Sequence, residues 1–194
     1  MLLYSDQIML IEALATQLGA LLADKNKKIV TAESCTGGWV AQAITQVPGS
    51  SLWFDRSFVT YSNDAKRQML GVKLRTLNRS GAVSREVVEE MASGALKKSA
   101  ADFSVAISGI AGPDGGTEEK PVGTVWFAWD IAGEVDSSMA LLPGSRRDVR
   151  AAAVTLALQG LLVRIRKWLA DHPGAVSGTG FAEKELTQLL DDSE

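Results

Sequence analysis

Residues 29–46 read IVTAESCTGGWVAQAITQ, and this stretch sets the type of fold. A short β-branched run is followed by a turn of small polar residues and then by an apolar segment at helical spacing. We predict a strand over residues 27–32, a turn over 33–38 and a helix over 39–46. A strand that passes through a glycine turn into a helix is typical of α/β proteins.

The rest of the chain continues this alternation of helices and strands. We expect helices over 6–23, 64–70, 85–98 and 146–170, and strands over 56–62, 103–108, 122–131 and 134–142. Asn63, Ser84 and Ser145 are the expected N-caps. The pair Ala132-Gly133 favours a tight turn, so the last two strands should form an antiparallel hairpin. Together these elements predict a three-layer α/β/α sandwich with a mixed, mostly parallel sheet.

Length and composition indicate one main domain and exclude several classes of protein. The 194 residues should form a domain over 1–170 and a flexible polar tail over 171–194, weakly helical near 183–190. The start carries no basic region and the apolar runs are interrupted by charge, so we expect neither a signal peptide nor a membrane span. The net charge of −3 argues against direct contact with nucleic acid, and the single cysteine fits a reducing compartment, which predicts a cytoplasmic protein.

The single histidine, His172, restricts the chemistry that the chain can perform. A histidine-based triad or metal site would have to be built on this residue, which lies in a polar stretch near the C-terminus. With Cys35 as the one cysteine, a structural zinc site is close to excluded, and we expect no metal and no cofactor. If the protein is an enzyme, its general base is therefore a residue other than histidine.

Loops rich in glycine, serine and threonine follow the expected strands at 33–38, 62–66 and 108–116. Ligands bind beyond the carboxyl ends of strands in open α/β sheets, so these loops predict a binding site. Ser34 would place a hydroxyl beside the positive end of a helix, which stabilises an oxyanion; alternatively, Ser34 or Thr36 only caps that helix. Lys66 would lie in a first helical turn, where burial and the dipole favour a neutral amine that could act as base; alternatively, it is a solvated lysine.

Further side chains could belong to the same site. Tyr61 could hydrogen-bond to this cluster or be a half-buried core aromatic. Cys35 is a rival nucleophile without a nearby base, and its other interpretation is a small buried hydrophobe. Arg146 and Arg147 begin the last helix, where they could bind a phosphate or only cap the helix as solvated side chains.

Five ordered motifs resemble the CinA C-terminal domain family. They are TAESCTGG (31–38), FVTYSN (58–63) with Lys66, GAVS (81–84), SGIAGPDGG (108–116) and KPVGT (120–124). The resemblance covers about residues 8–168 and implies a three-layer α/β/α fold, usually in a homo-oligomer, with a dimer favoured. It also implies hydrolysis of the carboxamide of nicotinamide mononucleotide (NMN) to nicotinate mononucleotide and ammonia. Carried over to this chain, Ser34 is the nucleophile, Lys66 the base and Tyr61 a support for this dyad.

The resemblance also implies a set of substrate contacts. These are Cys35, Thr36, Gly37, Gly38, Ser108, Gly109, Ile110, Ala111, Gly112 and Arg146. The run Ser145-Arg146-Arg147 departs from the family's Gly-Asp-Arg pattern, which leaves open which arginine holds the phosphate. Two other functions remain alternatives: a catalytically silent nucleotide-binding module, and an interaction role in DNA uptake or repair.

Overall fold

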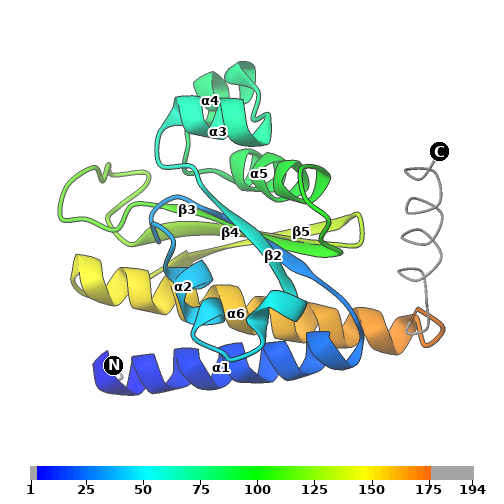
Figure 1. Ribbon diagram of the computed structural model, residues 1–194. Coiled ribbons are helices and arrows are strands. Elements are labelled where there is room, and N and C mark those ends of the chain that lie inside the picture. The colour runs from blue at the N-terminus through cyan, green and yellow to red at the C-terminus, as the bar shows by residue number, and fades with distance from the viewer. Residues whose placement is uncertain (1–3, 176–194) are drawn as a thin grey trace, which may run out of the picture.

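The computed structural model describes residues 4–175, which form a five-stranded sheet with helices on both faces (Figure 1). The strands are β1 (Ile29–Glu33), β2 (Phe54–Val59), β3 (Phe103–Gly109), β4 (Thr124–Ile131) and β5 (Glu134–Leu141). They lie in the order β2-β1-β3-β4-β5. The β2, β1 and β3 strands are parallel, β4 is antiparallel to β3, and β5 is antiparallel to β4. Four of these described strands therefore run in one direction, which confirms the mixed, mostly parallel sheet.

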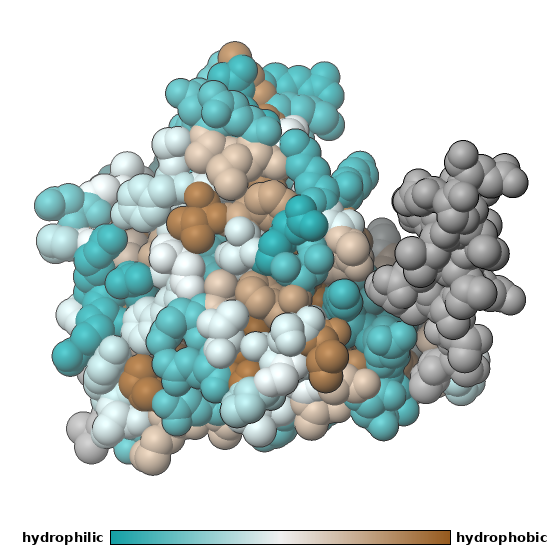
Figure 2. Space-filling view, in the orientation of Figure 1, coloured by the Kyte–Doolittle hydropathy of each residue, from teal (hydrophilic) through white to brown (hydrophobic). Residues whose placement is uncertain are grey.

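The helices form one layer on each face of the sheet, as Figure 1 shows. One layer holds α1 (Tyr4–Asp24), α2 (Trp39–Thr45) and α6 (Arg146–Asp171), and the other holds α3 (Asn63–Leu70), α4 (Leu74–Ser80) and α5 (Arg85–Lys97). A short 3₁₀ turn, Ser50–Leu52, precedes β2. This arrangement confirms the predicted three-layer sandwich. On the face seen in Figure 2, the region of α3 and α4 is largely hydrophilic.

Each face of the sheet packs against its own apolar cluster. The larger cluster joins α1, α2 and α6 to residues such as Phe103 and Phe127, and the smaller one joins α5 to Val30 and Ala106. The contact between α6 and the sheet depends on Gly160, because a Cβ at this position would overlap the Trp129 ring. Burial of these two clusters, at roughly 25 cal/mol per Å² of apolar surface, provides the main favourable term in folding.

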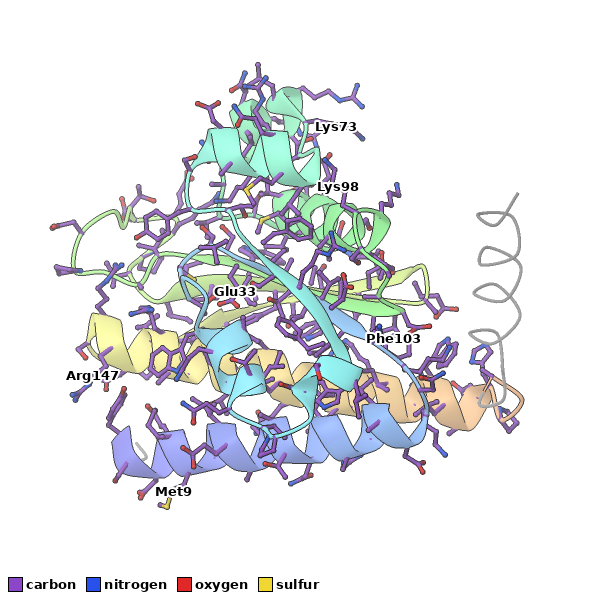
Figure 3. The ribbon with its side chains drawn as sticks, in the orientation of Figure 1. Met9, Glu33, Lys73, Lys98, Phe103 and Arg147 are labelled. Atoms are coloured by element: carbon purple, nitrogen blue, oxygen red, sulfur yellow. The ribbon has the colours of Figure 1, made fainter. Side chains whose placement is uncertain are left out.

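Helix α1 is long and apolar enough to cross a membrane by length and composition alone. In this fold it lies beside α6, with Ile11, Leu18 and Leu22 buried against the core. Its outward face carries exposed residues such as Met9, which points away from the body of the molecule in Figure 3. One face of the helix therefore packs into the core of the domain while the other face is exposed.

The structure corrects several local predictions. Helix α4 was not expected. The N-cap of α3 is Ser62 instead of Asn63, since Ser62 Oγ accepts the Ala65 N–H at 3.0 Å. Strand β2 begins and ends earlier than expected, so Tyr61 lies beyond the strand. The tail and its weak helix lie outside the described residues from 176 onward, and the proposed boundary at 170 stays a prediction.

Candidate active site

The candidate site lies where the predicted loops meet, at the carboxyl ends of β1, β2 and β3. The backbone hydrogen bonds between strands continue past these ends. Ser34 N–H donates to Ile107 O at 3.0 Å, and Thr60 N–H donates to Glu33 O at 2.8 Å. These bonds hold Ser34 between the neighbouring strands. A pocket of about 230 Å³ opens here. It is lined by Ser34, Cys35, Tyr61, Asn63, Lys66, Ala82, Val83, Ser108, Gly109, Ala111 and Arg146.

Ser34 and Lys66 meet inside this pocket. Lys66 Nζ lies 2.9 Å from Ser34 Oγ, and both side chains are buried. The amine also lies 2.8 Å from Thr60 O and 3.5 Å from Tyr61 O. A neutral amine has two N–H groups and one lone pair. The two carbonyl oxygens can accept both N–H groups, which leaves the lone pair for the proton of Ser34.

Burial changes the proton affinity of Lys66. It lowers the pKa of this amine from 10.5 to about 8, because the charged form loses its hydration. Among residues 4–175, no ion pair with a carboxylate compensates for this loss. A measurable fraction of Lys66 is therefore neutral near neutral pH, as a general base requires.

Cys35 lines the same pocket but is a poor nucleophile. Burial raises the pKa of its thiol to about 11, so the thiol stays protonated at neutral pH. The thiolate is the reactive form of cysteine. The geometry therefore favours Ser34 over its neighbour, and Cys35 acts as a small buried side chain.

Glu33 is a site residue that the sequence analysis missed. Its buried carboxylate accepts the N–H groups of Gly38, Val40 and Ala41 at 2.9, 3.1 and 2.9 Å. Figure 3 shows Glu33 between the sheet and α2. These bonds occupy N-terminal donors of α2, so the Gly38 N–H is bonded to Glu33 and is not free for a substrate. The available signal was a carboxylate placed just before a helix start, where it satisfies free N–H groups.

Arg146 faces the pocket, whereas Arg147 does not. Arg146 donates to Gly112 O at 2.9 Å and to the Tyr61 hydroxyl at 3.1 Å. The Arg147 guanidinium stacks on the Tyr4 ring, 4.2 Å from its centroid, at the outer end of α6 (Figure 3). Tyr61 is 63% exposed and therefore no core aromatic. Its phenol contacts Arg146, and only its backbone carbonyl lies near Lys66.

The other predicted contacts divide between the pocket and its surroundings. Four of them line the pocket: Cys35, Ser108, Gly109 and Ala111. Four lie outside the lining: Thr36, Gly37, Gly38 and Ile110. Gly112 is also outside it, and its carbonyl accepts a hydrogen bond from Arg146. Asn63, Ala82 and Val83 were missed as lining residues.

The GAVS (81–84) and KPVGT (120–124) motifs hold the side of the pocket that Ala82 and Val83 form. Lys120 Nζ donates to Ser80 O at 2.8 Å and to Val83 O at 2.9 Å.

Fold and site together define an α/β/α protein with a buried serine–lysine pair at the carboxyl edge of its sheet. Within residues 4–175, no group of three or more histidine, cysteine, aspartate or glutamate side chains could hold a metal ion. The sequence profile of the CinA C-terminal domain matches residues 11–165. The chain belongs to this family.

Curated relatives carry the name of an enzyme. The chain is 58% identical over 149 residues to "Nicotinamide-nucleotide amidohydrolase PncC" of Escherichia coli (strain K12), covering 76% of this chain and 90% of the relative. It is 53% identical over 152 residues to the protein of the same name from Pseudomonas putida, covering 78% and 95%. A crystal structure titled as the competence/damage inducible protein CihA from Agrobacterium tumefaciens has a TM-score of 0.78 at 47% identity. That match covers 79% of this chain and 94% of the other.

Proposed function

We propose that this chain is a nicotinamide-nucleotide amidohydrolase that converts NMN and water to nicotinate mononucleotide and ammonia. The names of relatives at 53–58% identity support this substrate. The observation that carries the chemistry is the 2.9 Å contact between Ser34 Oγ and Lys66 Nζ inside the pocket. An alcohol beside a partly neutral amine can open an amide without histidine.

The first half of the reaction forms an acyl-enzyme. Lys66 accepts the proton of Ser34 as Ser34 Oγ attacks the carboxamide carbon of NMN. The carbonyl oxygen becomes an oxyanion, which backbone N–H groups of the turn after Ser34 stabilise. Collapse of this intermediate breaks the C–N bond, and the proton on Lys66 moves to the departing nitrogen to give ammonia.

The second half returns the enzyme to its starting state. Water attacks the nicotinoyl ester on Ser34 while Lys66 accepts one proton from the water. The ester C–O bond breaks, and Ser34 Oγ recovers its proton from Lys66. The product is the nicotinate carboxylic acid, which ionises at neutral pH. Protons balance over the cycle, and no redox cofactor is needed.

Arg146 is the residue that we assign to the phosphate of NMN. A guanidinium has five N–H donors, and the two bonds to Gly112 O and the Tyr61 hydroxyl leave others for a phosphate. The same side chain starts α6, whose N-terminus favours an anion. Tyr61 then supports the site by orienting Arg146, and its carbonyl orients Lys66.

Further properties belong to this proposal. We propose a cytoplasmic homo-oligomer, with a dimer favoured, that acts on a small molecule and contacts neither membrane nor nucleic acid. The net charge of −3 supports the last point. Exposed apolar residues on the edge strand β5, Val135, Met139 and Leu141, support self-association. Light scattering at several protein concentrations and a gel-shift experiment at physiological salt test these points.

The central experiment measures ammonia release from NMN by the wild-type protein and by Ser34→Ala and Lys66→Met variants. We expect turnover by wild type and losses of at least about 10³-fold in both variants, with folding checked by circular dichroism. Near-normal turnover in either variant contradicts the serine–lysine mechanism. Binding of NMN to wild type without ammonia release would instead indicate a silent nucleotide-binding module.

A further inference from the structure

Arg150 contacts the turn that follows Ser34, although neither the sequence motifs nor the pocket lining single it out. It lies on α6, one helical turn after Arg146. Its Nε donates to Cys35 O at 3.1 Å and its Nη2 donates to Thr36 O at 2.8 Å. Its guanidinium also lies 5.3 Å from the centroid of the Trp39 ring, which holds the planar group from a second side.

These two bonds help to orient the peptide units of the turn, together with the bond that the Trp39 N–H donates to Thr36 O at 3.3 Å. In a trans peptide the C=O and the following N–H point in opposite directions. Because the carbonyls of Cys35 and Thr36 both point to Arg150, the N–H groups of Thr36 and Gly37 point away from it. The Gly37 N–H is occupied, since it donates to the backbone carbonyl of Ser34 at 3.1 Å. Within residues 4–175 no hydrogen bond occupies the Thr36 N–H, which points away from Arg150.

The turn needs such a restraint because glycine follows directly. Gly37 has a φ of +63° and Gly38 a φ of +93°, and glycine adopts many other backbone conformations at little cost. Glu33 holds the far end of the turn through the Gly38 N–H at 2.9 Å. The near end, which carries the peptide units beside Ser34, has its carbonyls held by Arg150.

We propose that Arg150 is a positioning residue for the amidohydrolase reaction: it holds the Cys35 and Thr36 carbonyls so that the Thr36 N–H faces the oxyanion formed at Ser34. This inference rests on the proposed function for its substrate. Arg150 acts through the backbone and does not touch NMN. It differs in this respect from Arg146, which lines the pocket itself.

An electrostatic role would give a different result from this geometric role. If the positive charge of Arg150 acted on Lys66, an Arg150→Lys variant would retain most of the activity. An Arg150→Met variant would then shift the pH dependence. If geometry matters, a lysine cannot span both carbonyls with a planar fork, so both variants lose activity and neither shifts the pH midpoint.

The test compares Arg150→Met and Arg150→Lys with Arg164→Met as a matched control. Arg164 lies on the same helix, stacks 3.8 Å from the centroid of the Trp129 ring and donates to Gly160 O at 3.3 Å, but lies away from the pocket. We expect kcat for NMN to fall about 10² to 10³-fold in both Arg150 variants, the loss typical of one oxyanion donor. The KM should change less than threefold, and Arg164→Met should keep wild-type kcat.

A second measurement makes the result independent of the substrate. Labelling of Ser34 by a fluorophosphonate, followed by intact mass, also requires the oxyanion donor. We expect labelling to slow at least tenfold in both Arg150 variants. If wild type is labelled but releases no ammonia from NMN, the proposed function fails while slower labelling still supports Arg150. The inference is overturned if Arg150→Met keeps the kcat and the labelling rate of wild type. It is also overturned if Arg150→Lys keeps them, or if the wild-type protein is neither labelled nor active.

Discussion

Removing the amine of Lys66 should make the protein more stable while it abolishes catalysis. Burial lowers the pKa of Lys66 from 10.5 to about 8, so the folded state binds this proton less tightly than the unfolded state. At about 1.4 kcal/mol per pKa unit, this shift destabilises the fold at neutral pH by up to about 3 kcal/mol. A Lys66→Met variant escapes that cost.

Part of the gain is offset by a lost hydrogen bond. The Thr60 carbonyl, 2.8 Å from Lys66 Nζ, would lose its partner, at a cost of about 1–2 kcal/mol. We therefore expect a net stabilisation of about 1–2 kcal/mol at pH 7.5. Such a gain would mark a residue that is kept for chemistry at the expense of stability.

The pH dependence of this difference is the sharper test. Since the folded pKa is depressed, the unfolded state binds more protons between pH 8 and 10.5, and wild type regains stability as the pH rises. The free energy lost with the hydrogen bond to Thr60 O does not change with pH in this range. The advantage of Lys66→Met should therefore shrink by about 2 kcal/mol between pH 7.5 and 9.5.

Urea unfolding at a series of pH values measures this difference. Lys98→Met, which removes an exposed lysine on the α5 side of the sheet, controls for the loss of one positive charge. A difference between Lys66→Met and wild type that stays constant over this range refutes the reasoning. So does a variant that is more than about 1 kcal/mol less stable than wild type at pH 7.5.

Three other outcomes follow from the geometry. The kcat/KM for NMN should rise about tenfold per pH unit toward a plateau above pH 8, because the neutral form of Lys66 is the base; a profile that is flat from pH 6 to 9 speaks against it. An Arg146→Met variant should raise KM about 10 to 100-fold for NMN and much less for the unphosphorylated nucleoside. Equal effects on the two substrates would contradict the proposal that Arg146 binds the phosphate. A Gly160→Ala variant should lose about 1–3 kcal/mol of stability in thermal unfolding, because the added methyl overlaps the Trp129 ring; an unchanged Tm would show that α6 can shift freely.

Local signals account for the elements that sequence analysis predicted well. Ser84 caps α5, and Ser145 with Asp148 forms a capping box at the start of α6. The Ala132-Gly133 turn joins β4 to β5. Each of these signals depends on hydrogen bonds within about four residues, so the pattern alone carries it.

The missed helix, α4, depends on a partner that is distant in the sequence. The N-cap residue of helix α4, Lys73, makes no side-chain cap. Its first turn is instead held by Glu90 of α5, which accepts the Lys73 N–H and the Thr76 hydroxyl at 2.8 Å each. Glu90 lies 17 residues from Lys73 and 14 from Thr76, so a short window of sequence does not contain these pairs.

The sequence by itself determined the order of the elements other than α4, the argument against a histidine base and the candidates Ser34, Lys66, Tyr61 and Arg146. Only the tertiary structure decided which of them meet. Ser34 and Lys66 are 32 residues apart and Arg150 is 115 residues from Cys35, so their contacts depend on the strand order β2-β1-β3 and on the position of α6. The reactivity of Lys66 has the same origin, because its lowered pKa arises from burial, which is a property of the packed molecule.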